Sequence, residues 1–209
     1  MKKAIYLLLF LLAIPCIGFA QSDADKCWKK KYRNIGFVKS TLSQDGSADL
    51  KSNYGANLTF GRTYYLHKTP VLNLIKFGID ATWFDLSYAN YDIMYEEDGY
   101  SDEYQFHTAE VAMQVGPSIT LMPFRKFNIH TYFRYAPSFS CNYVEEEFQG
   151  NYATFFVTGG TVSYKNLGIG DEARFGHTEF KPFLYDGDEE VDKVKTKTKG
   201  LRAFITLKF

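Results

Sequence analysis

The four histidines of this chain are the residues best suited to acid–base chemistry near neutral pH: His67, His107, His130 and His177. Hydrolytic catalysis would require a histidine beside a nucleophile such as serine and beside a carboxylate. The segment His177-Thr178-Glu179 puts an imidazole and a carboxylate on one face of a strand, but the sequence offers no matching nucleophile. It also lacks metal-ligand spacing, phosphate-binding loops and nucleophile elbows. We therefore expect no catalytic, metal or cofactor site.

Charged residues of both signs recur on the polar side of segments that otherwise alternate with apolar residues. They are Lys76, Asp80, Glu110, Arg134 and Arg202, joined by Glu172 and Arg174 if their segment is read in the correct register. An isolated buried charge is too costly, so opposite charges that share an interior must pair with one another. The chemistry of this set is therefore ion pairing, provided that the elements carrying it enclose an interior.

These elements are β-strands, because alternation with a period of two residues runs through almost the whole chain. The eight expected strands span about residues 32–42, 50–66, 72–90, 104–121, 127–144, 151–164, 167–182 and 199–209. In the fifth of them, Phe133 and Tyr135 lie on one face and Arg134 on the other. The polar faces are rich in Gly, Ser and Thr, which suits a narrow interior better than a water-exposed surface.

The strand at 167–182 is the hardest to assign. Simple alternation puts Glu172 and Arg174 on the polar face, but it also puts Asp171 on the apolar face. A bulge near Gly168 or Gly170 would change this register.

Short connections alternate along the chain with longer, more polar ones. The short ones lie around 67–70, 122–126 and 164–166, and the others at 43–48, 91–103, 145–150 and 186–199. Short turns at one end and longer loops at the other are typical of an up-and-down outer-membrane barrel. An even number of strands then places both chain ends on the short-turn, periplasmic side. The connection at 91–103 is acidic and rich in tyrosine, which favours a solvated loop or a binding surface.

The N-terminus has the pattern of a secretory signal peptide. Lys2 and Lys3 precede an apolar run, and small residues end at Ala20, so we expect residues 1–20 to be removed. Lipidation at Cys16 is an alternative, although a proline precedes this cysteine. Without residues 1–20, 22 basic residues face 24 acidic ones, a net charge of −2, and nothing indicates nucleic acid as a partner. After residue 20, no apolar run is long enough for a membrane-spanning helix.

The last strand ends the chain on an aromatic ring. Its alternate apolar positions are Leu201, Ala203, Ile205, Leu207 and Phe209. This pattern resembles the C-terminal signal strand of outer-membrane β-barrels, and residues 32–209 resemble the small porin-like outer-membrane β-barrel family, of the PorT-like or OmpA/OmpX-like kind. The resemblance implies an all-β, eight-stranded antiparallel transmembrane barrel in the outer membrane of a Gram-negative cell. It also implies that the barrel-assembly machinery recognises the final strand.

The expected organisation is thus a signal peptide (1–20), a periplasmic segment (21–31) and a barrel (32–209). Because an eight-stranded barrel is largely filled by its own side chains, we interpret the lumen charges as a plug. The function expected is a structural or cell-surface interaction role. The alternatives are a narrow channel or export-accessory barrel, then an outer-membrane lipid-modifying enzyme, then a soluble lipocalin-like carrier.

Four lysines precede the final strand at odd-numbered positions, like the residues of its apolar face: Lys193, Lys195, Lys197 and Lys199. If the strand continues to them, they point outward above the hydrocarbon, where lipopolysaccharide phosphates would attract them. A flexible loop in which they balance nearby acids is the alternative. We expect outer-membrane lipids and lipopolysaccharide as partners, a surface ligand of unknown kind, and a monomer. Cys27 and Cys141 are expected to remain unbonded, because the barrel separates them.

Overall fold

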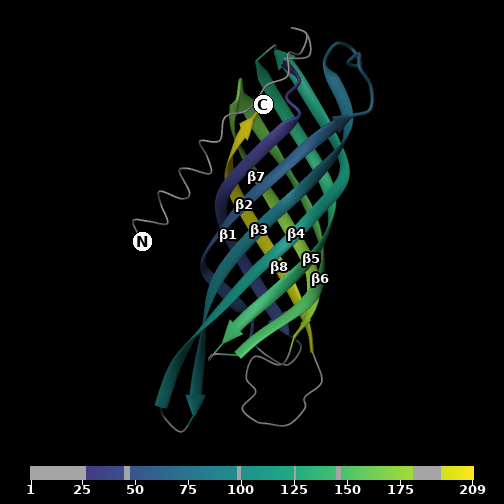
Figure 1. The fold of residues 1–209 in the computed structure, drawn as a ribbon. Coiled ribbons are helices and arrows are strands. Elements are labelled where there is room, and N and C mark those ends of the chain that lie inside the picture. Colours follow the sequence, from purple (N-terminus) through teal and green to yellow (C-terminus); the bar gives the residue numbers. More distant parts are fainter. Residues whose placement is uncertain (1–26, 45–47, 98–99, 125, 145–146, 181–193) are drawn as a thin grey trace.

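The computed structural model describes residues 27–44, 48–97, 100–124, 126–144, 147–180 and 194–209, which form one closed, all-antiparallel eight-stranded barrel (Figure 1). The predicted signal peptide and residues 21–26 lie outside this described part. The strands are β1 (Lys31–Gln44), β2 (Leu50–Tyr65), β3 (Ile75–Glu97), β4 (Tyr100–Phe124), β5 (Phe127–Val144), β6 (Glu147–Tyr164), β7 (Leu167–Phe180) and β8 (Val194–Lys208). The expected fold class is confirmed. Among the described residues, no helix has the length and apolar character needed to cross a membrane.

Each strand pairs with its neighbours in sequence, and β8 pairs with β1 to close the sheet. At the closure, the Lys31 amide donates to the Phe209 carbonyl at 2.9 Å, and the Phe209 amide donates to the Lys31 carbonyl at 3.0 Å. We call this end of the barrel the C-terminal rim and the opposite end the far rim. The last residue of the chain is therefore part of the seam.

The connections at the C-terminal rim are mostly short. Residues 165–166 form a two-residue turn between β6 and β7, in which Lys165 has a φ of 57°. The connection between β2 and β3 is longer than expected, because β3 begins at Ile75 rather than at residue 72. Leu72 and Asn73 have φ values of 51° and 55°, a left-handed conformation that ends regular pairing.

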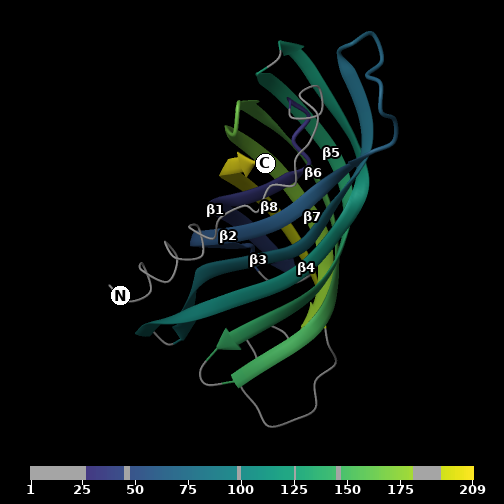
Figure 2. The same cartoon turned by 45° about the horizontal axis from the view of Figure 1, so that its top comes forward.

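The far rim differs more from the sequence-based expectation. Residues 91–97 and 100–103 continue β3 and β4 as a paired ribbon, which projects beyond the barrel wall (Figures 1 and 2). The prediction of a loop over 91–103 was therefore wrong. Tyrosine has a high β propensity, which favours a strand in this segment, and Tyr91 at its start packs edge-on against Phe106 of β4. Likewise, β6 begins at Glu147 inside the connection expected at 145–150.

The wall has an apolar outside and a polar inside. On β3, Phe77 and Ile79 are 43% and 44% exposed, whereas Lys76 before them and Asp80 after them are buried. A soluble carrier has the opposite arrangement, with apolar residues inside. A closed barrel satisfies all strand hydrogen bonds internally, so this apolar outer wall can face lipid.

Register shifts interrupt the strand pairing at several places, and the one that changes which carboxylate enters the lumen is a bulge on β3. Thr82 pairs with Gln114 and Asp85 pairs with Ala112, so Trp83 and Phe84 both face outward and Asp85 turns inward. The pairing of β7 with β6 and β8 has no such shift. A bulge near Gly168 or Gly170 is therefore excluded, and Asp171 does lie on the outer wall.

Candidate functional site

The lumen is crossed by three layers of ion pairs, each built from a guanidinium and at least one carboxylate. In the layer nearest the C-terminal rim, Arg134 of β5 donates through Nε to Asp80 of β3 at 2.9 Å. Asp80 also accepts from Thr63 Oγ1 at 2.8 Å, and His130 Nε2 lies 3.4 Å from it. The Arg134 side chain stacks on the ring of Tyr132, 3.4 Å from its centroid. Arg134 is thus held on several sides at once.

The middle layer joins β8 to β3 and β7. Arg202 Nη1 donates to Asp85 Oδ2 at 2.8 Å and to Glu172 Oε1 at 2.9 Å. Gln114 donates to the same Asp85 oxygen at 2.7 Å, and Tyr132 donates to Glu172 Oε2 at 2.8 Å. Both carboxylates are buried, so their charges are neutralised by direct contacts rather than by solvent.

The layer nearest the far rim pairs Arg174 of β7 with Glu110 of β4. Ser140 donates to Glu110 at 3.3 Å, and the Arg174 guanidinium stacks over the Phe155 ring, 3.6 Å from its centroid. Glu110 therefore pairs with Arg174, whereas Arg134 pairs with Asp80.

The structure places all five sequence-selected lumen charges inside the barrel, but it distributes them unequally. Lys76 lies apart from the three layers, at the C-terminal rim, with Nζ 4.7 Å from the centroid of Trp28 and 5.2 Å from that of Tyr65. Trp28 is itself buried in the mouth of the barrel, although it precedes the first strand.

Sequence reasoning missed Asp85, because strict alternation puts it on the outer face. A signal was present: Asp85 and Leu86 both have the wrong polarity for their parity, which indicates a slip of one residue just before them. The aromatic pair Trp83–Phe84 is where the slip occurs.

The described histidines lie in separate parts of the barrel, and their contacts differ. His107 Nδ1 lies 2.8 Å from the Tyr88 hydroxyl, and its ring stacks on that of Tyr88. His130 is buried against Thr120 and Asp80. His177 is exposed on the outer wall, paired across strands with Lys197. Among the described residues, no group of three or more His, Cys, Asp and Glu side chains could hold a metal ion.

The two cysteines lie toward opposite ends of the barrel. Cys27 precedes β1 at the C-terminal rim, and Cys141 lies near the end of β5 that approaches the far rim. Both are free thiols.

The final strand carries two exposed sets of side chains on its outer face. Leu201, Ala203, Ile205 and Leu207 face outward along the half nearer the C-terminal rim. Beyond them β8 extends to Val194, so Lys195, Lys197 and Lys199 continue the same face, while Thr196 and Thr198 point inward. Lys193 lies outside the described residues. We call the three described lysines the lysine ridge.

Comparisons with solved structures find barrels of similar general architecture. Neisserial surface protein A (NspA) is 12% identical with a TM-score of 0.48, over 86% of this chain and 97% of that chain. The outer membrane protease OmpT from Escherichia coli is 9% identical with a TM-score of 0.49, over 91% and 99%. OprG, an outer membrane protein from Pseudomonas aeruginosa, is 11% identical with a TM-score of 0.43, over 87% and 96%. These likenesses concern the arrangement of strands and assign no activity.

No protein-family model and no curated protein matches the sequence. The distribution of apolar and polar residues over the barrel says more about its location than these comparisons do. Its apolar outer wall, polar interior and closed eight-stranded sheet have the form of a small transmembrane β-barrel of the outer membrane.

Proposed function

We propose that the protein is a non-catalytic outer-membrane barrel with a closed lumen and a structural or cell-surface role. The observation that carries this proposal is the stack of three ion-pair layers across the lumen. Each of Arg134, Arg202 and Arg174 reaches from its own strand to a carboxylate on another strand. The C-terminal rim is then the periplasmic end and the far rim the extracellular end.

A narrow channel or export-accessory barrel is the main alternative, and it would need a continuous path. Two cavities lined by lumen residues have volumes of about 10 and 20 Å³. A cavity of that size holds about one water molecule. The ion-pair layers therefore favour a plug over a path. A lipid-modifying enzyme has less support, because the hydroxyl, imidazole and carboxylate of Thr120, His130 and Asp80 meet inside the lumen, where they are buried away from lipid.

The surface role that we propose is association of the lysine ridge with the phosphates of lipopolysaccharide. The lysines begin directly above Leu201, where the apolar face of β8 ends. At the far rim this is the level of the outer-leaflet headgroups. Lys39 is exposed on the adjacent β1, across from Leu201, and extends the cationic surface. A flexible loop, the alternative considered from the sequence, is inconsistent with the paired strand seen from Val194 onward.

Replacing Lys195, Lys197 and Lys199 together by Gln should reduce the lipopolysaccharide that copurifies with the barrel. Each lysine near an anionic headgroup layer contributes on the order of 1 kcal/mol, so the triple variant should bind far more weakly. The fraction folded, measured by heat-dependent gel mobility, should not change, because all three side chains are exposed.

A matched control replaces Lys31, Lys126 and Lys165 by Gln. These are three exposed lysines at the C-terminal rim, which faces the other leaflet. The control removes the same charge but should keep its lipopolysaccharide. Equal retention by both variants, or equal loss, would show that the ridge has no special role.

A further inference from the structure

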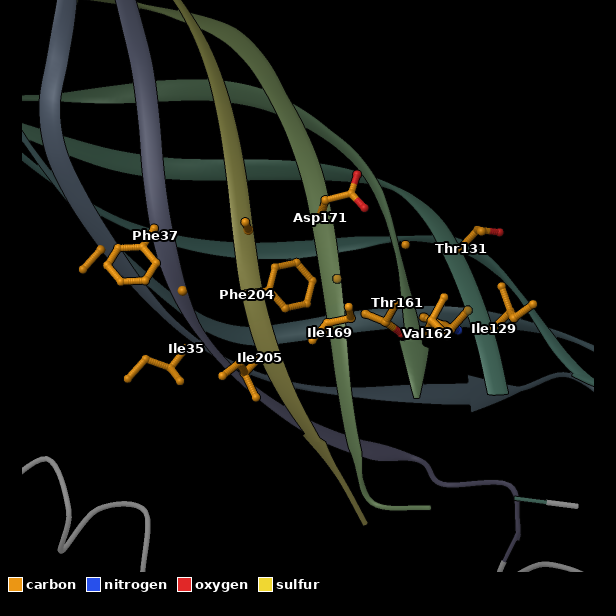
Figure 3. Close-up of a pocket in the computed structure, with 16 residues that line it drawn as sticks. Ile35, Phe37, Ile129, Thr131, Thr161, Val162, Ile169, Asp171, Phe204 and Ile205 are labelled. Atoms are coloured by element: carbon orange, nitrogen blue, oxygen red, sulfur yellow. The ribbon is translucent and has the colours of Figure 1, made fainter. Parts of the chain in front are cut away.

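An acidic side chain, Asp171, lies in a mainly apolar part of the described outer wall. Asp171 of β7 is exposed there, and its cross-strand neighbours are Gly160 on β6 and Ala203 on β8. Figure 3 shows its carboxylate projecting from the wall beside Ile169. Within the described part of the chain, no hydrogen bond or ion pair involves this carboxylate.

The position of Asp171 puts it inside the hydrocarbon. It is the fifth residue of β7, which begins at the C-terminal rim. Four residues of a strand tilted by roughly 40° rise about 10 Å, and the apolar band of such barrels is about 25 Å tall. An aspartate side chain is too short to reach water from that depth. Ionisable residues within the membrane usually pair with another group, which marks this carboxylate as a contact site.

We propose that a second copy of this chain covers this face, with Asp171 of each copy paired to Arg33 of the other. Two barrels inserted in the same direction must be related by a two-fold axis along the membrane normal, and such an interface makes every contact twice. If this axis runs over β8, then β7 of one copy faces β1 of the other. Asp171 lies on β7 and Arg33 on β1, both on the outer wall.

The two residues lie at similar heights. Hydrogen-bonded rows climb toward the far rim in the order β7, β8, β1, and the row of Asp171 passes through Ala203 to Phe37. Strands about 4.8 Å apart and tilted by roughly 40° gain about 3 Å at each step. The part of β1 that lies at the same height in the membrane as Asp171 is therefore two to three residues before Phe37. Arg33 is within about 4 Å of that level, which its long side chain can span.

The shape of the face supports the same partner. A groove of about 900 Å³ crosses the wall from β5 through β8 to β2, with Ala203 of β8 in its lining. Phe37, which also lines it, is 80% exposed because its cross-strand neighbours are Ala56 and Ala203 (Figure 3). In the two-fold arrangement the Phe37 ring of one copy lies opposite Ala173 on β7 of the other. A protruding ring thus meets a small residue.

Arg33 is suited to this contact. Its guanidinium stacks over the rings of Phe60 and Phe209, 5.6 and 5.3 Å from their centroids, which holds the cation at the outer surface of the wall. A stacked guanidinium can still donate hydrogen bonds in its plane to a carboxylate. This dimer replaces the monomer expected from the sequence, and it does not depend on the lysine ridge.

Cross-linking in native outer membranes tests the axis. In a Cys27→Ser, Cys141→Ser background, Ala203→Cys should form a disulfide-linked dimer under mild oxidation, because β8 faces its own copy. Ala109→Cys is the matched control, since Ala109 is exposed on the outer face of β4, on the other side of the barrel. It should stay monomeric. A monomeric Ala203→Cys, or equal cross-linking at both positions, would overturn the proposal.

Charge variants in the Ala203→Cys chain test the ion pair. Asp171→Asn or Arg33→Asp alone should lower the cross-linked fraction at least about tenfold, because the first removes the charge that faces Arg33 of the other copy and the second sets two carboxylates against each other in lipid. Combining Asp171→Arg with Arg33→Asp should restore it. Heat-dependent mobility confirms that each variant has inserted, and Asp171→Asn changes no shape. Unchanged cross-linking in inserted Asp171→Asn would mean that Asp171 faces lipid alone.

Discussion

At the scale of single residues, the Arg134–Asp80 pair should determine much of the stability of the barrel. Arg134→Ala leaves Asp80 charged and buried, and breaking one side of a buried pair costs about 3–5 kcal/mol. Adding Asp80→Asn removes that uncompensated charge, so the double variant should be more heat-stable than Arg134→Ala alone. The temperature at which the folded gel band disappears measures the difference. Lys51→Ala, at an exposed position, should leave this temperature unchanged.

Equal heat stability of the single and double variants would contradict the plug. It would mean that water reaches Asp80 and screens its charge, which is the condition of a conducting lumen.

Which lumen residues would face inward was predictable, but their partners were not. Alternation depends only on whether a residue occupies an odd or an even position in its strand, and this assigned Arg134, Asp80 and Glu110 to the inside. Pairing depends on register and on bulges, which are set by contacts between strands distant in sequence. The slip of one residue at Trp83–Phe84 brings Asp85 to Arg202, a contact that no local pattern contains.

At the scale of elements, the final strand should be required for assembly. Deleting Phe209, or replacing it with Asp, removes the terminal apolar ring from the seam between β1 and β8. We expect such variants to accumulate in the periplasm or to be degraded. The amount of folded barrel in outer-membrane fractions measures this outcome.

Phe124→Asp is the matched control for this experiment. Phe124 is 75% exposed at the end of β4, also at the C-terminal rim, but it is not in the terminal strand. Normal insertion of Phe124→Asp together with failure of Phe209→Asp would assign the effect to the terminal strand. Normal insertion of both would refute a recognition role for Phe209.

The existence of all eight strands was predictable because each carries a long alternating pattern. Their ends were less so. Residues 91–103 are acidic enough to suggest a loop, yet they pair in register from Tyr91 with Phe106 to Glu97 with Tyr100. Backbone pairing and β propensity outweighed charge there, and composition alone does not show which of these effects is larger.

At the scale of the whole molecule, membrane insertion follows from which face is apolar, and alternation alone leaves this open. Small polar residues on one face suggested a narrow interior, and the closed topology shows that interior directly. The outward position of Asp171 was visible in the sequence as an anomaly of register. It becomes informative only when closure puts β7 and β1 on either side of β8.

The proposed plug predicts that the wild-type barrel is electrically silent. In planar bilayers containing salt, purified barrel should give no steady conductance steps, since a plug of ion-pair layers and side chains would leave no continuous aqueous path. Combining Arg134→Ala with Arg202→Ala removes the guanidinium groups of two layers and leaves Asp80, Asp85 and Glu172 unbalanced. This variant should conduct in small steps and favour cations, because the exposed carboxylates attract them. Lys195→Ala with Lys197→Ala removes two positive charges outside the lumen and should stay silent. Wild-type steps as large as those of the double arginine variant would replace the plug with a channel.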